Sequence, residues 1–404
     1  MTSTLHLGKL ASTQVGYCTN VHAGTDLNSI RENLTRYAVA VREKLALTRP
    51  CEQLGVGLWI PDEASRQLVD GELDRFAAFL TEAKLSAFTI NGFPFANFHG
   101  DRVKQGVYLP TWADRERLEY TQRLATILSA IMPDDEAIGS ISTLPIGWPD
   151  NPFANDNARN IKLDVAGANL RTLATFLADL HDSSGREITV AIEPEPGCTL
   201  DTVDDMVAFF DAQLPDKQHR QYISACHDIC HSAVMNEPQR DAIKAYADAG
   251  ISIGKVQVSS AIVADWKSIP AEQHADALKQ LSEFAEDRYL HQTGQVDRQG
   301  GFRLATDLPE LIRQTDVEKL AELDRWVIHF HVPIFLERFG LLQTTRAEVL
   351  ECLAALSDAE IDVDFTGHLE AETYAWTVLP SEMRARGLAE DIAGELDWLC
   401  SKLV

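Results

Sequence analysis

Three short stretches of the sequence join an apolar run to side chains that can bind a metal ion. One apolar run ends in Asp228, with His231 three positions further on. A second run ends in Glu193, and a third carries His329 and His331 two positions apart. Side chains alternate between the two faces of a strand, so residues two apart point the same way and can share one ion. These stretches predict one pocket with a divalent metal centre.

Glu193 is the central carboxylate of this prediction. It ends its run between apolar neighbours and just before Pro194, which predicts a side chain with little water around it. An unpaired buried carboxylate is costly, and a divalent cation stabilises it. The alternative for Glu193 is a salt bridge to an Arg or Lys. The alternative for His329 and His331 is that they pack against backbone carbonyls. Glu195 follows Pro194, where the strand geometry is doubtful, and we expect it to be a solvated loop acid.

Two further stretches extend the candidate ligand set. Glu370 and Glu372 lie on one face of the last apolar run, and we expect Glu372, nearer its end, to complete the coordination shell. Gln257 ends another run and offers a neutral oxygen that could ligate the ion or hold substrate hydroxyls.

The charge of the chain restricts its partners. The sequence has 61 acidic residues against 36 Lys and Arg, a net charge of -25, and no basic run offsets this excess. Such a charge repels phosphate backbones, so we expect no nucleic-acid partner. A small-molecule metabolite, neutral, cationic or held through a metal, is the expected ligand.

The cysteines and the amino terminus indicate the compartment. Seven scattered cysteines make a disulfide framework improbable and favour a reducing environment. Residues 1–10 lack a basic start followed by an apolar core, and no run approaches membrane-spanning length. The expectation is a cytoplasmic protein without membrane insertion.

These residues need a scaffold that brings distant strand ends together. Short apolar runs alternate with segments of helical periodicity, which is typical of parallel strands joined by right-handed helical crossovers. For one domain of this size the predicted fold is a (β/α)8 TIM barrel. The candidate strands are nine, one more than the barrel needs: 12–20, 55–60, 87–91, 138–144, 188–193, 222–227, 251–259, 326–332 and 363–372.

The ninth strand points to an insertion. Residues 260–325, after the seventh strand, contain a helical segment, an extended stretch at 289–292 and a Gly-containing turn. No repeat or linker divides the chain, so a single domain over 1–404 with this insertion is preferred to two domains.

The loops after the strands are rich in polar residues. All such loops lie on the carboxyl-terminal face of a barrel, where active sites are built. No phosphate-binding glycine loop, nucleophile elbow or zinc-protease helix is present, so nucleophilic catalysis has no support. Substrate contacts are predicted for His22, Asn91, Trp148, Lys255, His291 and Glu370.

The spaced series of ligands resembles the xylose isomerase-like TIM-barrel superfamily, which includes sugar isomerases, ketose epimerases and endonuclease IV. The resemblance implies a divalent ion (Zn, Mn or Mg) on Glu193, Asp228, Gln257 and Glu372, with Gln257 in place of the usual His. The pairs Asp228-x-x-His231 and His329-x-His331 resemble additional zinc-binding elements of endonuclease IV. Asn91 and the region around Ser142 replace its early-strand histidines, so its three-metal nuclease site is not reproduced.

A closer resemblance is to the EboE branch, called metabolite-traffic proteins. It rests on the segments 16–22, 289–292, 329–333 and 369–380 and extends over nearly the whole chain. It implies a role in a gene-cluster-encoded pathway that makes or exports a secondary metabolite, without specifying a reaction.

Three functions remain open. The leading hypothesis is a metal-dependent isomerase or epimerase of a small hydroxylated metabolite, in which Glu193 or Glu372 moves a proton and the metal stabilises the resulting enediolate. His331 could bind substrate or relay protons. A dinuclear phosphoesterase, with a second ion on His231, His329 and His331, is the first alternative. The second is a non-catalytic carrier that holds a metabolite in an aromatic-lined barrel mouth.

Overall fold

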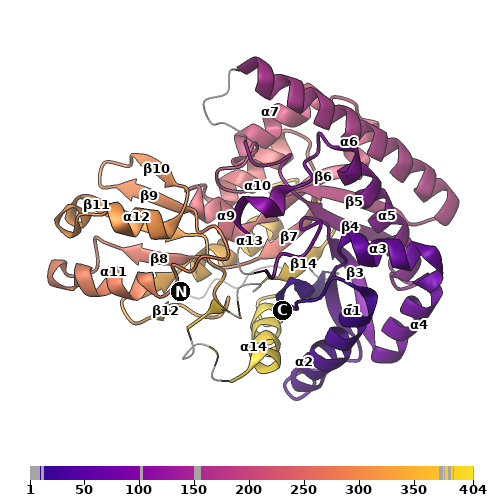
Figure 1. The fold of residues 1–404 in the computed structure, drawn as a ribbon, viewed down its shortest axis with the longest axis horizontal. Coiled ribbons are helices and arrows are strands. Elements are labelled where there is room, and N and C mark those ends of the chain that lie inside the picture. Colours follow the sequence, from indigo (N-terminus) through magenta and orange to yellow (C-terminus); the bar gives the residue numbers. More distant parts are fainter. Residues whose placement is uncertain are drawn as a thin grey trace.

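The computed structural model describes residues 10, 13–100, 103–149, 156–372, 376, 378–380, 384 and 386–403, and the backbone alone of 156–161. Eight parallel strands close into a barrel, which confirms the predicted (β/α)8 fold (Figure 1). Around the barrel they follow the order β1-β2-β3-β4-β5-β6-β7-β14, with β14 pairing β1. Their bounds are Gln14–Cys18, Leu54–Trp59, Leu85–Asn91, Ile138–Thr143, Glu187–Ile192, Ile223–Asp228, Ile253–Val258 and His368–Ala371.

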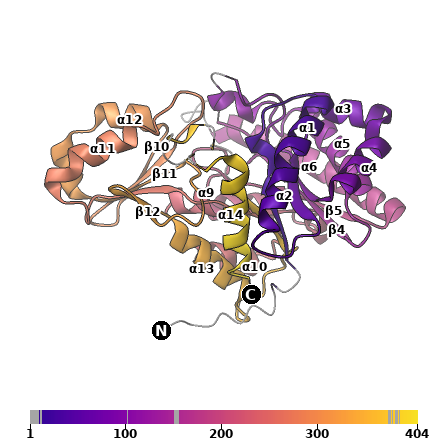
Figure 2. The same cartoon turned by 90° about the horizontal axis from the view of Figure 1, so that it is seen from below.

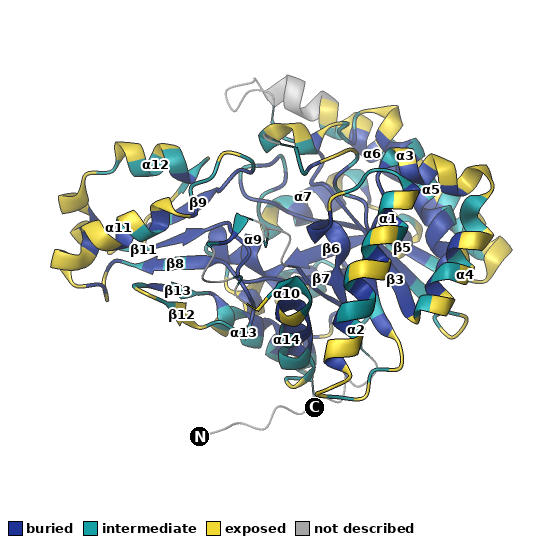
Figure 3. Ribbon diagram, turned by 60° about the horizontal axis from the view of Figure 1, so that its bottom comes forward, coloured by how far each residue is buried: buried dark blue, intermediate teal, exposed yellow. Residues whose placement is uncertain are grey.

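Helices cover the outside of the barrel. The strands are almost wholly buried and the helices expose their outer faces (Figure 3), because a parallel sheet packs apolar side chains on both of its surfaces. The helices after successive strands are α1 (Leu27–Asn33) with α2 (Val39–Leu45), α3 (Asp62–Gln67) with α4 (Leu73–Ala83), α5 (Arg115–Ile131), α6 (Asp156–Ser184), α7 (Val203–Gln213) with α8 (Lys217–Tyr222), α9 (Ile229–Val234) with α10 (Gln239–Asp248), α13 (Arg346–Ser357) and α14 (Leu388–Cys400).

A second sheet is inserted between β7 and α13. It has six antiparallel strands in the order β10-β9-β11-β8-β13-β12 and lies to one side of the barrel (Figures 1 and 2). Its own apolar core packs under two helices. Its elements are β8 (Ile262–Asp265), α11 (His274–Ser282), β9 (Thr293–Asp297), β10 (Phe302–Ala305), α12 (Leu308–Gln314), β11 (Leu323–Ile328), β12 (Arg338–Phe339) and β13 (Leu342–Thr344).

The inserted sheet accounts for the ninth candidate strand. The stretch predicted as strand 326–332 supplies the end of β11, which pairs with β8 and β9 rather than with a barrel strand. The sheet continues to Thr344, past the predicted limit of 325, because β13 returns to pair with β8. It follows β7 and therefore starts at the carboxyl-terminal face of the barrel. Among the described residues, no helix combines the length and the apolar character that crossing a bilayer requires.

Candidate metal centre

Three carboxylates converge at the carboxyl-terminal face of the barrel. Glu193 follows β5, Asp228 ends β6 and Glu372 follows β14, and one oxygen of each lies within 4.8 Å of the others. All three are buried, at 5%, 2% and 6% exposure. The nearby ammonium of Lys255 pairs with Glu370 instead. The three acids therefore form a buried cluster whose negative charge calls for a cation.

The pKa values of the three acids shift in different directions. Burial raises the pKa of Glu193 and of Glu372 well above the usual range, and repulsion from the neighbouring carboxylates adds to the shift. Burial also acts on Asp228, but the attraction of His231 and His331 and its hydrogen bonds outweigh that effect and lower its pKa. Without a cation, Asp228 is the acid that stays ionised most readily.

Two buried oxygens, one on Asp228 and one on its neighbour across the strands, Gln257, have no hydrogen-bond donor among the described residues. Asp228 caps α9, and its Oδ1 accepts from the backbone N–H of His231 (2.9 Å) and from Ser259 Oγ (2.8 Å), which leaves Oδ2. Gln257 Nε2 donates to Asn91 Oδ1 (3.0 Å), which leaves Gln257 Oε1. Orphaned oxygens beside clustered carboxylates fit a divalent cation, which such donors ligate.

Three imidazoles border the carboxylates, and their orientations are fixed by hydrogen bonds. Each ring has its Nδ1 within 2.9 Å of a carbonyl oxygen, which can only accept, so Nδ1 carries the proton and Nε2 the lone pair. This arrangement is usual for histidines that bind metal through Nε2. The three bonds join His231 to the Pro194 carbonyl, His329 to Gln292 Oε1 and His331 to the Glu372 carbonyl.

The imidazoles also lie against one another. The Nε2 atoms of His231 and His329 are 3.2 Å apart, so two lone pairs face each other. Burial, together with the neighbouring imidazoles, lowers the pKa of His329 well below its usual value. Burial lowers that of His331 to about 4, in spite of Asp228 nearby. Lone pairs so placed repel unless a cation lies between them, so a second ion fits here, with Glu195 beside His231 and His329.

Glu195 corrects a sequence prediction. Its expected role as a solvated loop acid is wrong: the residue is 7% exposed and its Oε1 accepts from Tyr108 Oη (2.8 Å). Burial raises the pKa of Glu195. The attraction of His231 and the hydrogen bonds from Tyr108 and Gln292 partly offset this rise. The spacing of two residues between Glu193 and Glu195 indicates that both side chains can share one face of a strand. Pro194 between them argues against a regular strand at this point.

A second layer of polar groups lies inside the barrel. Lys255 and Glu370 form a fully buried ion pair, and Asn91 joins them by donating to Glu370 Oε1 (2.8 Å) and accepting from Lys255 Nζ (2.8 Å). Gly57 makes room for the Glu370 carboxylate, because a Cβ at that position would overlap it. Here the carboxylate is compensated by the protein itself.

Three residues predicted to contact substrate do not line the cavity of this site, which is described below. His22 bonds to Tyr17 Oη (3.1 Å) and stacks on Tyr37. Trp148 packs on Tyr108, with ring centroids 5.2 Å apart. His291 bonds to Glu286 Oε1 (3.0 Å) and to the carbonyl of His329 (3.0 Å), so it supports the metal-capable histidine from behind.

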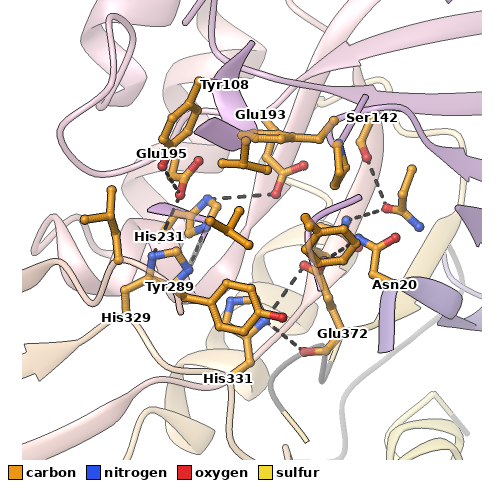
Figure 4. Close-up of a pocket in the computed structure, with 18 of the residues that line it drawn as sticks. Asn20, Tyr108, Ser142, Glu193, Glu195, His231, Tyr289, His329, His331 and Glu372 are labelled. Carbon is orange, nitrogen blue, oxygen red and sulfur yellow. Dashed lines mark hydrogen bonds and ion pairs between the residues drawn. The ribbon is translucent and has the colours of Figure 1, made fainter. Parts of the chain in front are cut away.

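Apart from Asp228, the ligand groups line one cavity with about 670 Å³ of empty space, a volume that includes open solvent at its mouth. Figure 4 shows carboxylates and imidazoles from barrel and insertion directed toward this space. Its polar wall consists of Asn20, Asn91, Ser142, Glu193, Glu195, His231, Gln257, His329, His331 and Glu372. Lys255 and Glu370 lie beneath that wall, and Asn91 connects them to it.

The fold and the site together define a (β/α)8 barrel with a candidate divalent-metal centre at the carboxyl-terminal ends of its strands. No family model matches the sequence, and no curated protein is similar to it. Among solved structures, a xylose isomerase-like TIM barrel protein from Mycobacterium smegmatis in complex with magnesium is similar in fold. It has a TM-score of 0.51 and 11% identity, with 98% of this chain and 97% of that chain covered.

Two other solved structures are similar at lower scores. One is the IOLI protein with a binding zinc atom, with a TM-score of 0.45, 12% identity and coverage of 97% of this chain and 98% of that chain. The other is a xylose isomerase domain protein from Alicyclobacillus acidocaldarius, with a TM-score of 0.45, 13% identity and coverage of 96% and 99%.

Proposed function

We propose that this protein is a metal-dependent isomerase or epimerase of a small metabolite that carries adjacent oxygens. The observation that supports it best is the buried cluster of Glu193, Asp228 and Glu372, with orphaned oxygens on Asp228 and Gln257. Glu193, Gln257 and Glu372 line the cavity. A divalent ion held there would polarise adjacent hydroxyl and carbonyl oxygens of a substrate. The EboE resemblance adds a proposed role in secondary-metabolite synthesis or export, and seven free cysteines support a cytoplasmic location.

The chain's own residues supply the proton transfer. Glu193 and Glu372 come from strands on opposite sides of β6 and β7, so they approach a substrate from two directions. One carboxylate removes a proton from the hydroxyl-bearing carbon, and either the same or the other carboxylate returns it. Return to the adjacent carbonyl carbon, with transfer of the hydroxyl proton to the former carbonyl oxygen, isomerises the substrate, whereas return to the opposite face of the same carbon epimerises it. Neutral His331 can accept a hydrogen bond through Nε2.

Elemental analysis of protein purified without chelator or affinity-tag metal tests the metal site. We expect near-stoichiometric Mg, Mn or Zn in the wild type and its loss in Glu193→Ala. Glu187→Ala, at the other end of the same strand, is the matched control and should keep the metal. A wild-type protein that holds no ion even after addition of Mn²⁺ or Zn²⁺ would overturn the proposal in favour of a metal-free carrier.

Deuterium uptake tests the reaction itself. With metal-loaded protein in D₂O, we expect exchange at the hydroxyl-bearing carbon of α-hydroxyketone probes such as dihydroxyacetone and 2-hydroxyacetophenone, followed by NMR. The exchange should disappear on Glu372→Gln. Exchange at the rate of the buffer, in protein shown to contain its ion, would count against isomerase or epimerase chemistry.

A dinuclear phosphoesterase is the second candidate. The specific observation in its favour is the pair of lone-pair nitrogens, His231 Nε2 and His329 Nε2, 3.2 Å apart next to the carboxylate cluster. Anomalous diffraction from zinc-soaked crystals distinguishes the phosphoesterase from the isomerase. Two peaks about 3.5–4 Å apart support the dinuclear site. A single peak on the carboxylates leaves the isomerase proposal alone.

A further inference from the structure

The cavity has two unlike walls. The ligand groups occupy one, and the other is apolar, built from Phe93, Phe98, Val103, Val107, Tyr289 and Leu290. A sugar has hydroxyls on nearly every carbon, and those facing this second wall would lose their hydrogen bonds to water without gaining others. The apolar wall is therefore better suited to carbon than to hydroxyl groups.

The apolar wall is preformed. One part of it belongs to the loop between β3 and α5, and the other to residues 286–292 of the insertion. Backbone hydrogen bonds join the two parts, since the N–H groups of Val103 (2.8 Å) and Lys104 (3.1 Å) both donate to the Arg288 carbonyl. Phe98 and Tyr289 belong to one buried aromatic cluster, with ring centroids 6.4 Å apart. A wall held in this way can select the shape of a ligand.

The charges of the cavity disfavour a phosphorylated ligand. Among the lining residues that the structure describes, Lys104 is the one cation, and its Nζ is held by Asp307 and by Asp287 (3.3 Å). The remaining charged lining groups are carboxylates. Away from the bound metal, a phosphate tail would meet repulsion and no available counter-charge among the described lining residues.

We infer that the ligand is amphipathic: two adjacent oxygens for the metal-bearing wall, on an uncharged apolar body. This inference rests on the proposed function, because the metal must hold the oxygen-bearing end. It narrows the substrate class by excluding plain sugars and sugar phosphates.

Three hydroxamates with the same chelating head test the inference in Mn²⁺-loaded protein. Acetohydroxamate carries a methyl group, benzohydroxamate a phenyl ring and phosphoglycolohydroxamate a phosphate. We expect calorimetry to show benzohydroxamate binding at least about tenfold more tightly than acetohydroxamate, since the ring buries apolar surface. Phosphoglycolohydroxamate should bind more weakly than either. Equal affinities, or tightest binding of the phosphate, would overturn the inference.

A charge placed on the apolar wall should reverse this preference. In Val107→Lys, we expect benzohydroxamate to lose about tenfold in affinity and phosphoglycolohydroxamate to gain about as much. Val69→Lys is the matched control, because Val69 is 44% exposed and outside the cavity, and its affinities should equal those of the wild type. Unchanged affinities in Val107→Lys would show that the ring does not bind at this wall.

The outcomes separate this inference from the proposed function. If manganese binds and acetohydroxamate binds as well as benzohydroxamate, the metal proposal stands and the amphipathic ligand is wrong. If manganese binds and no hydroxamate does, the inference is likewise wrong. If no metal binds, both fall together.

Discussion

The barrel and the inserted sheet bring different chemistry to the same cavity. The barrel supplies carboxylates from strand ends, Glu193, Asp228 and Glu372, whereas the insertion supplies the imidazoles His329 and His331. The carboxylates repel one another and depend on compensation of charge. The imidazoles are neutral and depend on hydrogen bonds that aim their Nε2 atoms. Substitutions should therefore act through electrostatics in the barrel and through orientation in the insertion.

The largest effect is expected where the barrel compensates its own charge. Lys255→Met leaves Glu370 buried without its partner and should lower the free energy of unfolding by about 3–5 kcal/mol, measured by urea denaturation. The double variant Lys255→Met/Glu370→Leu removes both charges and should recover most of that loss. If the single variant is as stable as the wild type, electrostatic compensation does not govern the barrel interior.

Gly57, which makes room for the Glu370 carboxylate, allows a steric test of the same ion pair. Gly57→Ala places a Cβ on the Glu370 carboxylate and should cost about 3 kcal/mol, because the buried ion pair must shift. Gly106→Ala is the control, as nothing lies near its added Cβ, and its melting temperature should stay within a degree or two of the wild type. Similar melting temperatures for the two variants would contradict a tightly fitted carboxylate.

Metal-dependent stabilisation contrasts the two ligand groups directly. At a Mn²⁺ concentration of 100 Kd we expect the wild type to gain about 2.7 kcal/mol of stability. Glu193→Gln should lose this gain but be more stable than the wild type without metal, because it relieves repulsion among the carboxylates. His329→Ala should keep the gain at the carboxylate site. Thermal unfolding with and without Mn²⁺ measures both, and loss of the gain in His329→Ala would show that the two groups form one inseparable site.

The smallest effect concerns a carboxyl outside both ligand groups. Burial and nearby acids raise the pKa of Glu237 to about 7, so the folded state holds its proton more tightly than the unfolded state does. This contribution to stability is complete at low pH and is lost as the pH rises from about 4.5 to 7. Glu237→Gln keeps the oxygen that accepts from the N–H of Val203.

The expected gain from Glu237→Gln is therefore about 1 kcal/mol at pH 8 and none near pH 4, after discounting for partial exposure. Urea denaturation at the two pH values measures it. A gain of equal size at both pH values would show that ionisation of Glu237 is not its cause.

The sequence predicts the barrel better than the insertion for a physical reason. Barrel strands are largely apolar runs, and a carboxylate directly after one, as at Glu193, has its position fixed by the topology. The strand 326–332 has the same apolar pattern, and the pattern alone cannot tell which sheet it joins. Its antiparallel pairing with β8 and β9 assigns it to the insertion.

The contacts between side chains are the other feature that the sequence does not predict. The sequence indicates Lys255, Glu370 and Asn91 as polar residues near strand ends, but not that they bond to one another across the barrel. His291 and Trp148 were expected to contact substrate from their place in polar loops, yet they pack behind other side chains. Contacts between residues far apart in sequence depend on register and rotamer, which periodicity does not encode.

Closure of the barrel through β14 sets the order of events during synthesis. Because β1 pairs with β14, its partner strand is translated more than three hundred residues after it, and the whole inserted sheet is made in between. At about 5–20 residues per second, the nascent chain keeps two unpaired strand edges for many seconds. Glu372 follows β14, so the complete set of ligands exists only after that strand has been made, and metal loading must follow its release.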